Sequence, residues 1–274
     1  MFRFPKDQQR WTVLALIGAV PLLAIAALGA FLLWQGTDAL GHLASAVFTE
    51  HDWLPVKGAF GITALLLGTT ATSLLALGLA LPIGLGAAIY LAQHAPPRLR
   101  ALGDAAVGLL GGMPSVIIGL WGMTWITPVF GNTLTSAFLV LAVMITPTLT
   151  LLAGSALRQV PAEVAETARA LGAGENLVTW VLVRHAWRGL AGASILAVSR
   201  ALGEAVALSM VAGNIPALPR LDGPISTLTT TLIIEFEGSV GDHRAALYLL
   251  AFMVMLLIAA FSLAGRYTHV EERP

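Results

Sequence analysis

Residues 11–34 read WTVLALIGAVPLLAIAALGAFLLW, a run of 24 residues with no charged side chain. A helix needs roughly 20 apolar residues to cross about 30 Å of hydrocarbon, so this run is long enough to span a bilayer. It also exceeds the roughly 7–15 residues of a signal-peptide core, although Arg3, Lys6 and Arg10 precede it. We therefore expect an uncleaved helix that anchors the chain in a membrane.

The rest of the chain repeats this apolar pattern. Hydrophobic residues make up 57% of the 274 residues and charged residues only 11%, and the mean hydropathy is +0.83. Such a chain lacks the polar side chains that cover a soluble domain. Five further apolar runs have no polar face at helical spacing, at residues 62–93, 102–128, 134–157, 189–213 and 245–265. The pattern predicts an all-α membrane bundle of about six spans.

Several classes of function are disfavoured by composition. The chain has no cysteine, which excludes disulfides, thiolate nucleophiles and thiolate metal sites. Its six histidines are scattered and lack paired-ligand spacing, so we expect no metal site. The formal net charge is zero, which gives no indication of a nucleic-acid partner. No nucleophile, base and acid converge at membrane depth, so an enzyme embedded in the membrane is disfavoured.

The basic residues predict the orientation of the spans, because cytoplasmic loops collect lysine and arginine near span ends. One predicted side holds Arg3, Lys6, Arg10, Arg98, Arg100, Arg158, Arg169, Arg184, Arg188, Arg266 and Arg273. The other side holds Lys57, Arg220 and Arg244. We expect the first side to be cytoplasmic and to contain both termini.

Two long loops are predicted on the outer side, at residues 36–61 and 214–244. Their carboxylates could engage an external partner or could simply be solvated, and the sequence leaves both possibilities open. These carboxylates are Asp38, Glu50, Asp52, Asp222, Glu235, Glu237 and Asp242. Tryptophans are enriched at membrane interfaces, where we expect Trp34, Trp53, Trp121 and Trp125.

Arg200 and Glu204 are two charged residues near the middle of the predicted span 189–213. A charge at this depth costs about 2.5–3.5 kcal/mol on insertion scales, so such residues usually line a pathway or pair with each other. Their i,i+4 spacing places them on one helical face. Arg200 could bind an anion in transit while Glu204 fixes its rotamer, or the pair could clamp two helices. The small residues Ser199, Gly203 and Ala207 favour close helix packing nearby.

The longest predicted inner loop, residues 158–188, contains helical signals. Apolar residues recur at helical spacing before Gly172, and Pro161 suits the first turn of a helix that Gly172 would end. A second amphipathic piece covers residues 176–187. The two helices could dock onto another protein or lie on the membrane surface.

The chain carries no ATP-binding loop. Its only lysines are Lys6 and Lys57, and neither ends the G-x-x-x-x-G-K-[ST] pattern that cradles ATP phosphates. We therefore expect no cofactor in this chain. If ATP drives the protein, a separate subunit must bind ATP and magnesium.

The inner loop resembles the EAA loop of bacterial ABC importer permeases. That loop reads EAA-x3-G-x9-I-x-L-P, and here it corresponds to Glu166, Thr167 and Ala168, followed after three residues by Gly172. The chain departs from the pattern at Thr167, which replaces an alanine, and at residues 184–185, which replace Leu-Pro. The resemblance implies a type I importer fold in which Glu166, Thr167, Ala168 and Gly172 form a cytoplasmic coupling helix that docks on an ATPase.

Further stretches resemble the PstC type of phosphate permease. In order, they are DWLP (52–55), GTTATS (68–73), PSVIIGLWG (114–122), RALGE (200–204) and GN (213–214). The resemblance implies a bacterial inner-membrane importer of inorganic phosphate, with Arg200 and Glu204 on the substrate pathway. It also implies three partners, namely a PstA-like second permease, a PstB-like ABC ATPase dimer and a PstS-like periplasmic phosphate-binding protein.

The expected organisation has three parts. Residues 1–61 form an anchor span and outer loop, residues 62–265 a permease core with its coupling loop near 158–188, and residues 266–274 a cytoplasmic tail. Two alternatives stay open: a self-contained oxyanion channel or secondary carrier, and an ABC permease for another oxyanion such as phosphonate, sulfate or molybdate. Sensitivity of uptake to changes at Glu166 or Gly172 would separate a coupled permease from a self-contained carrier.

Overall fold

A computed structural model describes residues 6–49 and 52–270, with side chains described at 14–37 and 52–266. Arg3, Glu50 and Arg273, which entered the predictions above, lie outside these residues. In chain order the elements are α1 (Lys6–Thr49), β1 (Trp53–Leu54), the 3-10 turn η1 (Pro55–Lys57), β2 (Ala59–Phe60), α2 (Thr63–Ile89), the π-helical turn η2 (Tyr90–His94), α3 (Pro97–Gly112), α4 (Ser115–Trp125), α5 (Thr127–Phe130), α6 (Leu134–Arg158), α7 (Ala162–Ala170), α8 (Glu175–His185), α9 (Trp187–Leu202), α10 (Val206–Val211), α11 (Leu228–Glu235) and α12 (Gly241–Val270).

The predicted all-α membrane bundle is confirmed, but the number of continuous spans differs from the prediction. Within the described residues, four helical segments are long and apolar enough to cross a membrane, and a bent pair can supply a fifth. The four are Leu14–Thr37, Thr63–His94, Leu134–Arg158 and Gly241–Arg266. The fifth predicted span, 189–213, is divided between α9 and α10, because the helix ends at Leu202 and resumes at Val206.

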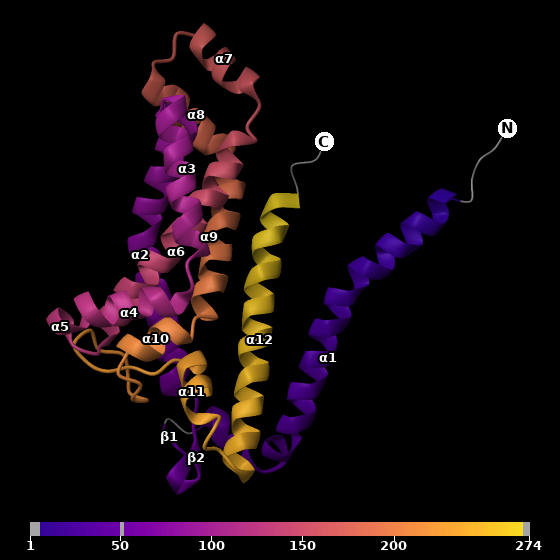
Figure 1. The fold of residues 1–274 in the computed structure, drawn as a ribbon, viewed down its shortest axis with the longest axis vertical. Helices are drawn as coiled ribbons and strands as arrows, with labels where there is room; N and C mark the ends of the chain where they lie inside the picture. The colour runs from indigo at the N-terminus through magenta and orange to yellow at the C-terminus, as the bar shows by residue number, and fades with distance from the viewer. Residues whose placement is uncertain (1–5, 50–51, 271–274) are drawn as a thin grey trace.

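The predicted span 102–128 is not a straight helix either. Helices α3 and α4 meet at an angle of 91°. Met113, the residue before Pro114, has an extended backbone with ψ of 135°. Proline disfavours the helical conformation of the residue before it, so the helix stops here and restarts in a new direction. Figure 1 shows α4 and α5 lying across the bundle rather than along it.

Helix α6 lies at the centre of the bundle and packs against α2, α9, α3 and α10. The contacts with α2 and α9 are rich in alanine, including Ala80, Ala153 and Ala197, all fully buried. The hydroxyl of Thr150 on α6 also donates a hydrogen bond to the carbonyl oxygen of Gly84 on α2 (3.3 Å). Small residues let helix backbones approach closely, which is how helices commonly associate in membranes.

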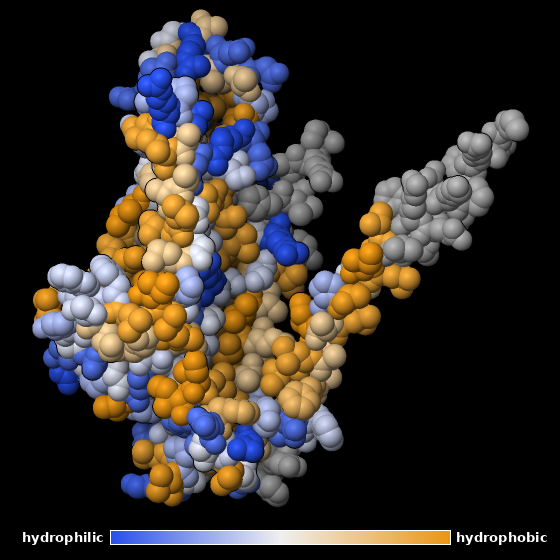
Figure 2. All heavy atoms as spheres, viewed as in Figure 1, coloured by the Kyte–Doolittle hydropathy of each residue, from blue (hydrophilic) through white to orange (hydrophobic). Residues whose placement is uncertain are grey.

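The two ends of the bundle differ in character. Figure 1 shows that α7 lies on the same side as the first turns of α1 and the last turns of α12, while β1, β2 and α11 lie on the opposite side. On the face drawn in Figure 2, apolar side chains cover α1 and the middle of the bundle, and polar side chains gather over α7 and α8. This distribution matches a helical bundle embedded in a bilayer.

Candidate functional site

The break between α9 and α10 positions the two charged residues singled out by the sequence. Gly203 is the C-cap of α9, and the backbone N–H of Glu204 donates to the carbonyl oxygen of Ala201 (3.2 Å). The carboxylate of Glu204 turns toward α10 and accepts a hydrogen bond from the backbone N–H of Ala207 (3.3 Å). Glu204 therefore satisfies one of the free N–H groups at the start of α10.

The expected i,i+4 ion pair does not form between Arg200 and Glu204, both of which are described. Such a pair needs one continuous helix, whereas here α9 ends at Leu202 between them. Arg200 lies in the last turn of α9 and is exposed in the isolated chain. The prediction that Glu204 fixes the rotamer of Arg200 is thus wrong, and so is the ion pair as a clamp between helices.

A run of hydroxyl residues supports this break, and the sequence analysis missed it. The run covers residues 226–231, and all of its polar side chains are buried. The hydroxyl of Thr229 donates to the carbonyl oxygen of Glu204 (2.7 Å). The hydroxyl of Thr69 on α2 accepts the backbone N–H of Leu228 (3.0 Å). The sequence STLTTT could have indicated this role, because a segment with so many hydroxyl groups is buried only when those groups form hydrogen bonds.

The predicted stripe of Ser199, Gly203 and Ala207 packs closely, but against two different helices. The hydroxyl of Ser199 contacts that of Ser262 on α12 (2.8 Å). A Cβ added at Gly203 would lie 3.2 Å from the side chain of Ile258, which is also on α12, so the end of α9 and α12 are in close contact. Ala207, beyond the break, instead lies against Gly119 of α4. The stripe holds both halves of the broken span in place.

The inner loop forms the two helices that the sequence predicted. Helix α7 ends in a Schellman motif: the N–H of Gly172 donates to the carbonyl of Arg169 (2.9 Å), and the N–H of Ala173 donates to that of Ala168 (3.0 Å). Gly172 has φ of +83°, which favours glycine, so its predicted role in ending the helix is confirmed. Glu166 and Thr167 are exposed on α7, and Ala168 is partly buried.

Helices α7 and α8 enclose a shallow hollow of about 450 Å³, which Thr167, Ala168 and Leu171 help to line. The side chain of Leu171 is 84% exposed at its edge. Across the turn, the guanidinium of Arg169 donates two hydrogen bonds to the carboxylate of Glu175 (3.0 and 3.2 Å). These bonds, and the charge of Arg169, lower the pKa of the Glu175 carboxyl from its ordinary value. The pair ties the two helices into one projecting unit.

Membrane-length helices around a broken span, with a paired-helix unit projecting from one end, define a multi-pass membrane protein. The chain belongs to the family described as the binding-protein-dependent transport system inner membrane component, which matches residues 80–273. The family consists of membrane components of transport systems that depend on a binding protein, and not of enzymes.

Curated relatives cover most of the chain. It is 31% identical over 285 residues to the phosphate transport system permease protein PstC of Xylella fastidiosa strain Temecula1, covering 92% of this chain and 88% of that protein. It is 32% identical to the protein of the same name from Mesorhizobium japonicum, covering 91% and 84%. The probable ABC transporter permease protein YqgH of Bacillus subtilis is 30% identical, covering 90% and 89%.

A solved structure shares the fold. A chain of the MetNI methionine ABC transporter, in an inward-facing conformation, superposes with a TM-score of 0.61 and 21% sequence identity. The match covers 81% of this chain and 97% of that chain. At this level of identity the likeness establishes the architecture of an ABC importer permease, as the inner-loop motif predicted.

Proposed function

We propose that this chain is the permease subunit of an ATP-driven importer that translocates inorganic phosphate delivered by an external binding protein. The observation that carries the proposal is similarity, over about nine tenths of the chain, to proteins named as phosphate transport permeases. The chain contributes the path through the membrane. ATP and magnesium are bound by a separate ABC ATPase dimer, so this chain holds no cofactor.

Arg200 is the residue that receives the phosphate in this proposal. Its guanidinium is exposed and forms no ion pair within the described part of the chain, so its donors are available to a ligand. A planar guanidinium offers a fork of N–H donors that suits a tetrahedral oxyanion. An exposed arginine within a membrane bundle needs a polar environment, which a path completed by a second permease subunit supplies. Glu204 belongs to the same path and fixes the backbone beside Arg200 through its cap on α10.

The projecting unit of α7 and α8 transmits the motion of the ATPase. Glu166, Thr167 and Ala168 present the docking face, and Gly172 sets the turn after it. The exposed Leu171 and the hollow between the helices offer apolar contact area for a partner. In this proposal the partners are a PstA-like permease, a PstB-like ATPase dimer and a PstS-like binding protein.

The orientation follows from the same proposal. Helix α7 faces the cytoplasm of a bacterium, and the protein lies in its inner membrane. The first turns of α1 and the last turns of α12 lie on the side of α7 (Figure 1), which supports two cytoplasmic termini. The excess of arginine in the segments on that side gives independent support.

The test of the substrate path is phosphate uptake by the complete transporter reconstituted in liposomes. We expect Arg200→Ala and Arg200→Lys to lower uptake at least about tenfold, because lysine keeps the charge but lacks the fork of donors. Arg220→Ala, in an outer loop where Arg220 pairs with Asp222 (3.5 Å), is the matched control and should retain uptake. An Arg200→Ala variant that transports normally would overturn the assigned path.

A second pair of variants tests the coupling to ATP. Gly172→Ala forces alanine into a left-handed conformation, at a cost of about 1–2 kcal/mol. Gly174→Ala lies two residues away, where φ is −70° and no atom lies near the added methyl group. We expect the first change, and not the second, to lower ATP-driven uptake. Uptake without ATP by the chain alone would indicate a self-contained carrier instead.

A further inference from the structure

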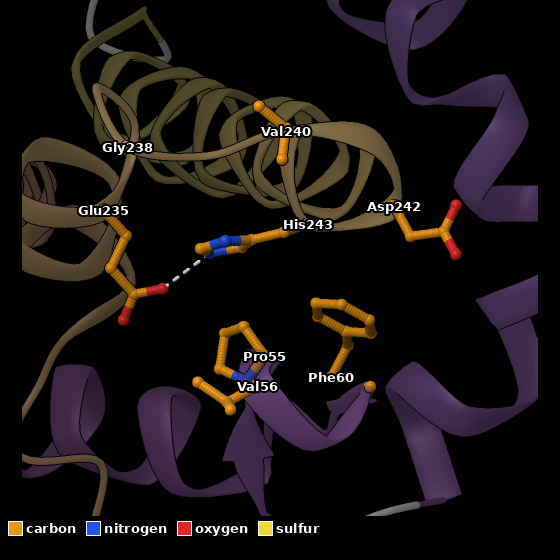
Figure 3. A pocket seen from close by; sticks show the side chains of 9 residues that line it. Pro55, Val56, Phe60, Glu235, Gly238, Val240, Asp242 and His243 are labelled. Carbon is orange, nitrogen blue, oxygen red and sulfur yellow. Dashed lines mark hydrogen bonds and ion pairs between the residues drawn. The ribbon is translucent and has the colours of Figure 1, made fainter.

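A hollow of about 570 Å³ opens at the end of the bundle opposite α7, and we refer to it as the outer hollow. It lies between the hairpin of β1 and β2 and the turn that joins α11 to α12. Figure 3 shows Glu235, Pro55, Phe60 and His243 gathered around it, with Asp242 on the opposite side of His243 from Glu235. The side chains used below are Val56, Phe60, Glu235, Val240, Asp242 and His243, all of which line the hollow.

The floor of the outer hollow is rigid. The indole N–H of Trp53 donates to Oε2 of Glu235 (2.9 Å), and Nε2 of His243 lies 2.8 Å from the same oxygen. Trp53 and Phe60 are each only 3% exposed, with ring centroids 5.6 Å apart. The indole of Trp53 is thus buried between the hairpin and the start of α12, and its expected place at a membrane interface stays a prediction. A floor fixed in this way loses little conformational entropy when a partner binds.

The rim carries aliphatic side chains with no partner. Val56 is fully exposed and Val240 is 75% exposed. Both lie in segments without continuous helix, and such backbone is not tolerated facing lipid within the hydrocarbon layer. These valines therefore lie in water or against another protein. Exposed valines at the mouth of a hollow that also carries carboxylates offer a partner both apolar and charged contacts.

The charge of the outer hollow selects a cationic partner. Segments 52–61 and 235–244 hold four carboxylates, at Asp52, Glu235, Glu237 and Asp242, against two permanent cations, at Lys57 and Arg244. The difference is −2 with His243 neutral. Among the described residues, Oε1 of Glu235 and the carboxylate of Asp242 accept no hydrogen bond, so both can receive a new donor.

We propose that the outer hollow is the docking site for a loop of the solute-binding protein, which inserts a lysine or arginine side chain into it. The proposal rests on the proposed function. A long basic side chain offers an aliphatic stem for Val56 or Val240 and a charged head for Glu235 or Asp242, which lie on opposite sides of His243 (Figure 3). The volume of the outer hollow exceeds that of one side chain, so the tip of the partner's loop enters together with the basic side chain. The family depends on a binding protein, and the hollow lies on the face away from α7.

The test adds a positive charge at the rim of the outer hollow and leaves its floor intact. The probe is the purified, phosphate-loaded binding protein of this transporter, added to the complete transporter in nanodiscs. Val56→Lys and Val240→Lys place a cation where the partner's cation must enter. We expect each to weaken binding by about tenfold or more, because like charges in contact oppose association. Stimulation of ATP hydrolysis by the binding protein should fall in parallel.

Two controls make the result specific. Val56→Glu changes the same exposed position but adds a negative charge, and it should bind as well as or better than the unchanged protein. Leu218→Lys adds a cation to another outer loop, at a residue 64% exposed that does not line the hollow. It should leave binding unchanged. Equal weakening by Leu218→Lys would attribute the effect to net charge and overturn the proposed site.

The outcomes separate this inference from the proposed function. Normal binding by both valine-to-lysine variants, with the unchanged transporter stimulated by the binding protein, would refute the outer hollow alone. If the phosphate-loaded binding protein neither binds nor stimulates the unchanged transporter, both the proposed function and the docking site are refuted.

Discussion

Thr229→Val tests whether the buried hydroxyl run holds the break between α9 and α10. Valine keeps the shape of threonine and removes its hydroxyl. In the structure this hydroxyl donates to the carbonyl oxygen of Glu204 (2.7 Å) and lies 3.1 Å from the hydroxyl of Thr227. Thr229 is only 6% exposed, so water does not readily replace the lost donor. The change leaves the carbonyl of Glu204 without its hydroxyl donor at the break.

The expected size of this effect follows from two ranges. A buried acceptor without a donor costs about 1–3 kcal/mol, whereas hydrogen bonds in membrane bundles contribute about 0.6–1.7 kcal/mol. We expect the Thr229→Val variant to lose about 1–1.7 kcal/mol of stability, where these ranges overlap. For a chain of this size, 1 kcal/mol corresponds to about 2–4 °C, so the melting temperature should fall by about 2–7 °C. Phosphate uptake should also fall, because Arg200 precedes the loosened segment.

The assay is thermal unfolding in detergent, combined with phosphate uptake by the reconstituted transporter. Thr229→Ser restores the hydroxyl and should recover both measurements. Thr124→Val is the matched control, because Thr124 is exposed and donates only within its own helix, to the carbonyl of Leu120 (2.8 Å). If Thr229→Val melts and transports as Thr229→Ser does, the hydroxyl run does not support the break.

Two further predictions concern the packing of α2 and the pH dependence of the projecting unit. Gly68→Ala should lower the melting temperature, because the added methyl group would overlap the carbonyl oxygen of Ser226, and overpacking costs about 1–3 kcal/mol. The hydrogen bonds from Arg169 lower the pKa of the Glu175 carboxyl from its ordinary value of 4.5. The pair therefore stabilises the turn fully at any pH above 4.5. This contribution should disappear as the pH falls through the lowered value, and hydrogen exchange of the amides at 169–175, corrected for intrinsic rates, should then accelerate.

Each of these predictions has a control. Gly78 lies in the same helix as Gly68 but with open space around its Cα, so Gly78→Ala should leave stability unchanged or raise it by about 0.5–1 kcal/mol. Equal melting temperatures for the two variants would contradict the predicted overlap. Glu175→Gln removes the titrating group, so its exchange should not show the acid-induced change. Persistence of that change in Glu175→Gln would assign it to another residue.

The sequence predicted local features of this protein well. The apolar runs identified the membrane helices, and the position of Gly172 identified the end of α7. Both features depend on residues close together in the chain. Helix capping and hydrophobic length are properties of short segments, so a single sequence is enough to find them.

The sequence could not predict contacts between distant segments. The i,i+4 spacing of Arg200 and Glu204 suggested an ion pair only because the helix was taken as continuous. The carbonyl of Glu204 is instead held by Thr229, 25 residues later. Trp53 resembled an interfacial tryptophan, but its indole meets Glu235 at a separation of 182 residues. Such partners depend on how the helices pack, which periodicity does not encode.

The bond between Thr229 and Glu204 also bears on the construction of chimeric permeases. The stretch around residues 200–211 and the stretch 226–231 are separate in sequence, but the buried hydroxyl of Thr229 donates to the carbonyl oxygen of Glu204 inside the bundle. A graft that brings in one stretch from a relative would leave polar groups of the other facing foreign side chains. Recombination between related permeases is therefore tolerated where both stretches are inherited from the same parent.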